Sequence, residues 1–222
     1  MSTKIFKLFI SKEIGVVSAK YMAPANPKCM LTLAHGAGAG MDHSFMEGLA
    51  TALSKAGIAS FRFNFPFSEN KKRRPDSPPA AHQTIASAIT KAHELHPKLP
   101  LFVAGKSFGG RMSSQYLSAY PKSAVKGIIF YGFPLHPSSK PSTDRADHLK
   151  TLKIPTLFLQ GSKDALAMWA LIEPVCKSLK KATLVRFEGA DHSFKAGKTN
   201  IIPLLVEETN NWIEKTLNNA PA

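Results

Sequence analysis

The residues best suited to chemistry surround Ser107, in the segment Gly105-Lys106-Ser107-Phe108-Gly109-Gly110. This segment matches the pattern G-x-S-x-G, with an apolar run typical of a buried strand before it and a helix-like stretch after it. A serine in such a strand-to-helix turn exposes its hydroxyl, and small glycines let the neighbouring backbone pass close by. The pattern therefore predicts a nucleophilic serine on the turn called a nucleophile elbow.

A serine hydroxyl is a weak nucleophile at neutral pH, so it needs a general base and an acid that orients the base. His192 is predicted as the base because, of the eight histidines, only this one follows the last predicted strand. Asp164 follows the preceding predicted strand, and parallel strands bring such positions to one edge of a sheet. Asp164 could also cap the helix after it, a role compatible with the first. Asp191 is the weaker rival for the acid, because side chains adjacent on a loop rarely face each other.

A glycine-rich segment, His35-Gly36-Ala37-Gly38-Ala39-Gly40, follows an earlier apolar run. Small residues in this position let backbone N–H groups point into a site without obstruction from side chains. We predict that the N–H groups of Ala37 and Phe108 stabilise an oxyanion, with Gly36 as the neighbouring candidate. The positive end of the helix dipole behind Ser107 would add to this stabilisation.

Three other interpretations of these motifs fail on spacing. A phosphate-binding loop would need G-x-x-x-x-G-K-[ST], but no glycine stands between Leu99 and Gly105. A dinucleotide-binding loop would need G-x-G-x-x-G, and Met41 or His43 occupies the place of its third glycine. The segment His93-Glu94-Leu95-His96 lacks the H-E-x-x-H spacing of a zinc site. We therefore predict no metal and no cofactor.

The elements that must position these residues alternate along the chain, which is typical of a parallel sheet with crossover helices. Several apolar runs are continuous, as expected for strands covered on both faces. The predicted strands are Cys29 to Ala34, Ile58 to Asn64, Leu99 to Ala104, Gly127 to Tyr131, Thr156 to Gln160 and Thr183 to Phe187. The predicted helices are Asp42 to Ala56, Ala80 to His96, Phe108 to Tyr120, Ala165 to Lys180 and Asn200 to Leu217.

The length of 222 residues, of which 44% are hydrophobic, suits one α/β domain over residues 1–222. Residues 1–25 are predicted to form a hairpin at the sheet edge, and residues 218–222 a frayed tail. The connections Pro66 to Pro79 and Gly132 to Pro155 are long, but too short for a large cap domain. Two cysteines, no signal peptide pattern and no long apolar stretch predict a cytoplasmic protein without a transmembrane segment.

The net charge is strongly positive, with 29 Lys and Arg against 15 Asp and Glu, giving +14. Such a surface attracts acidic partners or anionic surfaces without sequence-specific contacts. The basic residues are scattered apart from Lys71-Lys72-Arg73-Arg74, a cluster more typical of a solvated loop. Neither zinc spacing nor an aromatic-interleaved basic strand is present, which argues against nucleic-acid binding.

Longer segments carry a resemblance that spans nearly the whole chain. The sequence resembles small α/β-hydrolases of the testis-expressed protein thirty group and the hydrolase-like domain of the third regulatory subunit of the nonspecific-lethal complex. That group is similar to dienelactone-hydrolase-type enzymes. The matching segments are residues 33–38, 61–67 with Arg74-Pro75, 105–112, 131–137, 161–164 and 189–194.

This resemblance implies an α/β-hydrolase fold without a large lid, the triad Ser107, Asp164 and His192, and the basic loop Lys71 to Arg74 at the rim of the site. The expected activity is hydrolysis of a small-molecule ester or thioester through an acyl-enzyme. The alternative is an interaction module that keeps the fold, has little or no turnover and uses its basic surface.

Overall fold

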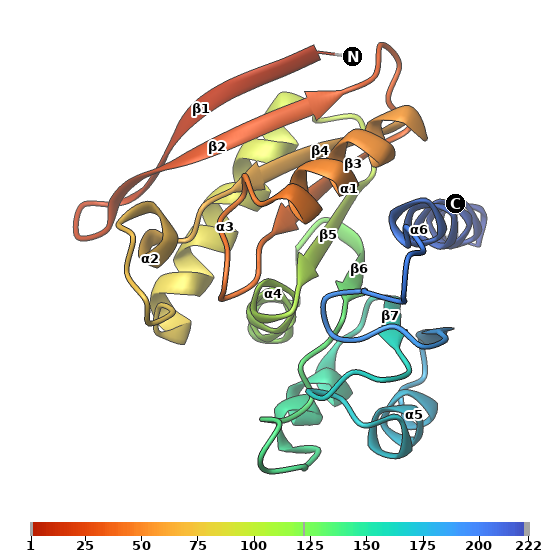
Figure 1. Cartoon of the computed structure of the whole chain (residues 1–222). Coiled ribbons are helices and arrows are strands. Elements are labelled where there is room, and N and C mark those ends of the chain that lie inside the picture. Colours follow the sequence, from red (N-terminus) through yellow and green to blue (C-terminus); the bar gives the residue numbers. More distant parts are fainter. Residues whose placement is uncertain (1, 122, 220–222) are drawn as a thin grey trace.

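The computed structural model describes residues 2–121 and 123–219 and contains an eight-stranded sheet (Figure 1). The strand order is β1-β2-β4-β3-β5-β6-β7-β8. Strand β2 pairs antiparallel with both β1 and β4. All the other pairings in the sheet, from β4 across to β8, are parallel. The strands are β1 (Ser2–Ser11), β2 (Gly15–Ala23), β3 (Cys29–Ala34), β4 (Ile58–Phe63), β5 (Leu101–Lys106), β6 (Val125–Tyr131), β7 (Thr156–Gly161) and β8 (Ala182–Phe187).

Helices cover both faces of this sheet. One hydrophobic cluster joins the sheet to α1 and α6, and a second joins the opposite face to α3, α4 and α5. The helices are α1 (Ser44–Lys55), α2 (Pro66–Glu69), α3 (Pro78–Leu95), α4 (Phe108–Ala119), α5 (Trp169–Ser178) and α6 (Ile202–Asn218), with a 3₁₀-helix, η1, at Asp144–Thr151.

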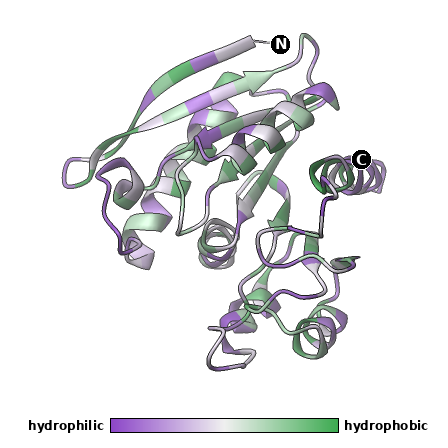
Figure 2. Cartoon of the chain, viewed as in Figure 1, coloured by the Kyte–Doolittle hydropathy of each residue, from purple (hydrophilic) through white to green (hydrophobic). Residues whose placement is uncertain are grey.

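Burial on both faces explains the continuous apolar strands. All six residues of β3, of β4 and of β7 are buried. Figure 2 shows hydrophobic residues concentrated along the central strands and hydrophilic residues on outer loops. At about 25 cal/mol per Å² of buried apolar surface, this double-sided burial is the main driving force that holds the strands in place.

The predicted α/β fold, a mostly parallel sheet with helices on both faces, is confirmed. Within the described residues, the two long connections hold only the short α2 and the 3₁₀-helix η1, which the sequence did not predict. The β1–β2 hairpin forms one edge of the sheet, with its turn between Ser11 and Gly15. The frayed tail predicted at 218–222 falls largely outside the described residues.

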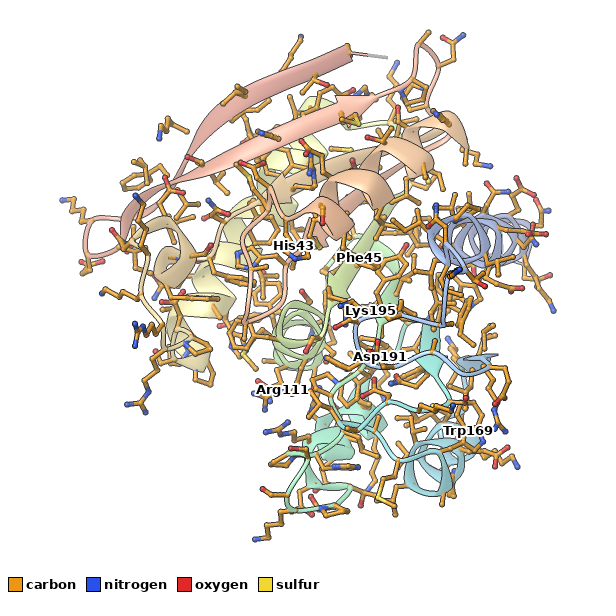
Figure 3. All side chains as sticks on the ribbon, in the orientation of Figure 1. His43, Phe45, Arg111, Trp169, Asp191 and Lys195 are labelled. Carbon is orange, nitrogen blue, oxygen red and sulfur yellow. The ribbon has the colours of Figure 1, made fainter. Side chains whose placement is uncertain are left out.

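The parallel strands end on one rim, where the site residues gather. The loop after β5 leads into α4, and the loops after β7 and β8 follow at the same rim. The start of α1, marked by His43 and Phe45, lies beside the loop that carries Asp191 and Lys195 (Figure 3). The stacked rings of Phe45 and Phe194, with centroids 5.9 Å apart, join these two segments. No helix among the described residues is long and apolar enough to cross a membrane.

Candidate active site

Ser107 occupies a strained turn between β5 and α4. Its φ angle is 50° and its ψ angle −115°, a backbone conformation that residues other than glycine rarely adopt. The turn is tight enough that a Cβ atom added at Gly105 would lie 2.3 Å from the backbone nitrogen of Gly110. A Cβ atom at Gly109 would lie 2.6 Å from the carbonyl oxygens of Ala34 and His35. Glycine is therefore required at both positions, because neighbouring backbone atoms occupy the space that a side chain would need.

Substituting Gly109 with alanine is expected to destabilise the protein, although alanine is ordinarily the better helix former. The added methyl group meets backbone atoms that cannot rotate away, so we expect a loss of about 2–3 kcal/mol and a Tm lower by roughly 4–10 °C. Gly38→Ala is the matched control, because no heavy atom lies within 4 Å of its added Cβ. Calorimetry of both variants measures the difference, and equal melting temperatures would contradict the turn geometry.

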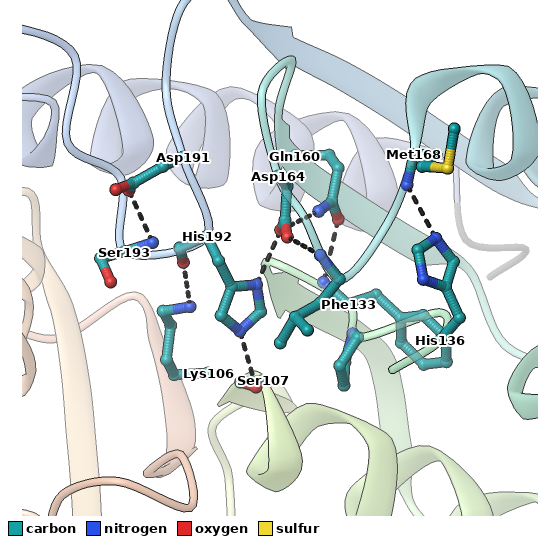
Figure 4. Close-up of polar contacts among 12 residues, drawn as sticks. Lys106, Ser107, Phe133, His136, Gln160, Asp164, Met168, Asp191, His192 and Ser193 are labelled. Atoms are coloured by element: carbon teal, nitrogen blue, oxygen red, sulfur yellow. Dashed lines mark hydrogen bonds and ion pairs between the residues drawn. The ribbon is translucent and has the colours of Figure 1, made fainter. Parts of the chain in front are cut away.

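The three residues predicted to do chemistry meet at the rim (Figure 4). His192 Nε2 lies 2.8 Å from Ser107 Oγ, and His192 Nδ1 lies 2.7 Å from Asp164 Oδ2. The Asp164 side chain is almost fully buried, whereas that of His192 is 22% exposed. A carboxylate at Nδ1 favours the tautomer whose Nε2 is free to accept a proton from the serine. The arrangement can thus deprotonate Ser107 as it attacks a carbonyl carbon.

Gln160, near the end of β7, holds the Asp164 carboxylate in place and was missed in the sequence. Its Nε2 donates to Asp164 Oδ2 at 2.5 Å, and its Oε1 accepts from the N–H of Phe133 at 2.9 Å. The N–H of Leu166 donates to the other carboxylate oxygen at 2.8 Å. These contacts compensate the burial of a charged group. A polar residue in an otherwise apolar strand, four positions before Asp164, was the available signal.

His136, also missed, fixes the segment that follows Asp164. The N–H of Met168 donates to His136 Nε2 at 3.1 Å, so His136 Nδ1 carries the proton and donates to the carbonyl of Pro137 at 2.9 Å. The N–H of His136 in turn donates to the carbonyl of Leu166. Residues just after Asp164 are therefore tied to the loop after β6, and α5 begins only at Trp169.

His35 shapes the glycine-rich loop from beneath. The N–H of Phe65 donates to its Nε2 at 3.0 Å, so Nδ1 carries the proton and donates to the Gly36 carbonyl at 2.7 Å. Because a trans peptide places its C=O and N–H on opposite sides, the N–H of Ala37 points away from this buried imidazole. Burial lowers the pKa of His35 to about 4.

That pKa makes stability depend on pH in a defined direction. Since the pKa of His35 is about 4 in the folded chain against 6.5 for the free side chain, the unfolded state binds protons more tightly between these values. The free energy of unfolding should therefore fall by up to about 3 kcal/mol from this residue as pH drops from 6.5 to 4. Urea denaturation across that range should show a smaller fall for His35→Gln. His93 is exposed, so the control variant His93→Gln should lose as much unfolding free energy between pH 6.5 and 4 as the wild type. If His35→Gln also lost as much as the wild type, the pKa shift would not belong to His35.

A cavity of about 390 Å³ opens beside Ser107. Its walls come from the glycine-rich loop, the start of α1 and the loop after β8, and are formed by Gly36, Ala37, Gly38, Ala39, His43, Phe45, Met46, Lys106, Ser107, Leu166, His192 and Ser193. The structure thus brings Gly36 and Ala37 beside the serine. Phe108 begins α4, where the first N–H groups have no acceptor within the helix, and its ring packs edge-on against Phe65.

The remaining candidates lie outside this arrangement. Asp191 accepts from the N–H groups of Ser193 and Lys195, so its carboxylate braces its own loop. Lys71 to Arg74 are exposed and do not line the cavity. In the described part of the chain, no group of three or more His, Cys, Asp or Glu side chains could hold a metal ion. His96 instead shares a hydrogen bond with the Tyr21 hydroxyl.

Comparison with known proteins assigns the fold to a family. A family model described as alpha/beta hydrolase domain matches residues 27–216. The structure is similar to dienelactone hydrolase from Anabaena variabilis, with 17% identity, a TM-score of 0.76, and 97% of this chain and 99% of that chain covered. It is also similar to an α/β serine hydrolase without lid from Xanthomonas campestris, at 17% identity and a TM-score of 0.71, covering 100% of this chain and 98% of that chain.

A third structure of this kind is an alpha-beta serine hydrolase homologue from Coxiella burnetii. It is 18% identical, with a TM-score of 0.73 and 99% of each chain covered. At these levels of identity the likeness concerns the fold. The alignments with the Anabaena variabilis and Coxiella burnetii structures cover 97% and 99% of this chain, which is more than the segment 27–216 matched by the family model.

Proposed function

The chain belongs to the alpha/beta hydrolase domain family, and we propose that it is a serine hydrolase that cleaves a carboxylic ester or thioester through an acyl-enzyme. The observation that carries this proposal is the continuous chain of hydrogen bonds from Ser107 through His192 to Asp164, at 2.8 and 2.7 Å. A hydroxyl, an imidazole and a buried carboxylate in this order form the arrangement that activates serine for acyl transfer.

In the first half of the reaction, Ser107 Oγ attacks the carbonyl carbon of the substrate while His192 Nε2 takes the hydroxyl proton. Asp164 stabilises the imidazolium that results. The negative charge that develops on the carbonyl oxygen is stabilised by the N–H groups of Ala37 and Phe108, with Gly36 beside them. The bond to the leaving group then breaks, and the alcohol or thiol departs with the proton from His192. The product of this half is an acyl-Ser107 ester.

In the second half, a water molecule gives a proton to His192 as its oxygen attacks the acyl carbon. The tetrahedral intermediate collapses, the acid leaves, and Ser107 recovers its proton from His192. The orientation of the Ala37 N–H away from His35 supports its role as a donor. The cavity of about 390 Å³ suits a small substrate. The narrower relationship to the testis-expressed protein thirty group is part of this proposal.

The experiment that tests the proposal is turnover of short aryl esters and matched thioesters by purified protein. We expect hydrolysis with an initial burst of leaving group equivalent to the enzyme concentration if deacylation is slower than acylation. Ser107→Ala should show neither burst nor turnover. Failure of the wild-type protein to hydrolyse any member of a chain-length series would overturn the proposal.

A further inference from the structure

Lys106 places a partly buried ammonium group next to the proposed nucleophile. It is the last residue of β5 and directly precedes Ser107. Side chains alternate along a strand, so Lys106 shares with Phe102 and Ala104 the face that α1 and α6 cover. Its aliphatic stem packs against the glycine-rich loop, with Cγ 3.7 Å from where a Cβ atom of Gly36 would stand. The residue therefore forms part of the cavity wall.

Among the residues that the structure describes, the ammonium group has a single hydrogen-bond acceptor. Lys106 Nζ donates to the carbonyl oxygen of His192 at 2.5 Å (Figure 4). It also lies 5.4 Å from the centre of the Phe194 ring. A lysine ammonium carries three donors. Among the described residues no carboxylate lies within ion-pair distance of it. Burial lowers the pKa of Lys106 to about 8, while attraction to Asp164 and Asp191 opposes the shift. The group thus keeps its charge at neutral pH.

Neither of these two carboxylates forms an ion pair with the ammonium group, and each accepts hydrogen bonds from other groups. Asp164 Oδ2 is shared between His192 and Gln160, and Asp191 Oδ1 accepts from the N–H groups of Ser193 and Lys195. A partly buried charge without a close counter-ion loses favourable hydration, and a negatively charged ligand group would offset that loss. The two spare donors of Lys106 are the protein groups available to bind it.

The rest of the cavity suits the same ligand. No acidic residue lines it, and its walls are mostly small or apolar, with Ala37, Ala39, Phe45, Met46 and Leu166 among them. In such surroundings a single ammonium attracts an anion far more strongly than in water. The net charge of +14 acts in the same direction at long range, since it raises the local concentration of anionic substrates.

We propose that the substrate carries a carboxylate on its acyl chain and that Lys106 binds this carboxylate while Ser107 attacks the ester or thioester carbonyl. This inference rests on the proposed function and names its substrate class. Gly36, Ala37 and Lys106 all line the cavity beside Ser107, so the acyl carbonyl and a carboxylate a few carbons away would bind in the same cavity. The half-esters and half-thioesters of short dicarboxylic acids fit this description.

The test compares two substrates of matched shape, monophenyl glutarate and phenyl 5-methylhexanoate, in which an isopropyl group replaces the carboxylate. A charge-assisted hydrogen bond is worth about 1.5–3 kcal/mol, so the wild-type kcat/KM should favour the glutarate ester by roughly tenfold to a hundredfold. Lys106→Gln should reduce this ratio to about one, and Lys106→Arg should keep most of it. Lys163→Gln, at an exposed lysine near Asp164, is the matched control and should keep the wild-type ratio.

Using a ratio removes any loss that both substrates share, including damage to the hydrogen bond between Lys106 and the His192 carbonyl. Hydrolysis of both esters at equal rates by the wild-type protein, or an unchanged ratio in Lys106→Gln, would overturn the inference and leave the proposed function standing. Calorimetric titration with glutarate gives a readout that needs no turnover: binding should be measurable for the wild type and lost in Lys106→Gln. Absence of binding to the wild type would also overturn it.

Discussion

Replacing Ser107 with alanine is expected to lower kcat/KM for every ester and thioester by about 10⁴- to 10⁶-fold. The reason is that the covalent route needs the serine oxygen, which lies 2.8 Å from His192 Nε2. Only stabilisation of a direct attack by water would remain. Steady-state kinetics with a short aryl ester measures the loss, and circular dichroism verifies that the variant is folded.

Ser193 provides the matched control for that loss. It lines the same cavity, but it is exposed and lies one residue beyond His192. Ser193→Ala should keep kcat/KM within about threefold of the wild type, because a surface hydroxyl away from the reacting atoms contributes little. A Ser107→Ala variant that retains a tenth or more of the wild-type rate would remove the serine from the mechanism.

Replacing Asp164 with asparagine is expected to lower kcat by about 10⁴-fold with little change in the fold. The amide keeps the size of the carboxylate but can no longer stabilise an imidazolium. It can also donate to His192 Nδ1, which favours the tautomer whose Nε2 already carries the proton. The measurement is kcat against pH for the variant and the wild type.

Asp191 is the control that separates the orienting acid from a merely nearby one. Its carboxylate accepts from the N–H groups of Ser193 and Lys195, and the asparagine oxygen can do the same. Asp191→Asn should therefore keep kcat within about threefold of the wild type. The opposite pattern, with Asp191→Asn inactive and Asp164→Asn active, would show that the orienting acid is Asp191 and not Asp164.

Much of the site could be anticipated because its spacing is tied to the fold. Continuous apolar runs identified the parallel strands, and parallel strands place their carboxyl ends on one rim. Ser107, Asp164 and His192 each follow such a run, so their proximity could be predicted although 85 residues separate Ser107 from His192. The spacing of the glycines then excluded a phosphate-binding loop at the serine and a dinucleotide-binding loop at the glycine-rich segment.

Side chains that support the site could not be predicted in this way. Gln160 and His136 act through partners far away in the chain, at Phe133 and Met168, and no local pattern specifies such contacts. A contact with the loop after β6 also accompanies the start of α5 at Trp169 and not at the predicted Ala165. The carbonyl of Leu166 accepts from the N–H of His136, whereas the helical hydrogen bonds begin only at the carbonyl of Met168, which accepts from Leu171 and Ile172.

The short helices in the long connections escaped prediction for a different reason. Helix α2, Pro66–Glu69, has only one turn, and the residues of η1, Asp144–Thr151, are mostly polar. Neither segment therefore shows the repeated apolar pattern of a longer helix. Tertiary contacts stabilise them instead. Phe67 of α2 and Leu149 of η1 are both buried in the core.

Covalent labelling with a fluorophosphonate tests the central claim most directly, since only an activated serine reacts with this group. Intact-mass measurement followed by peptide mapping should find one adduct per chain, located on Ser107, and none in Ser107→Ala. The rate of labelling should fall steeply in His192→Ala. An adduct on another residue, or esters hydrolysed by wild-type protein whose Ser107 stays unlabelled, would contradict the assignment of the nucleophile.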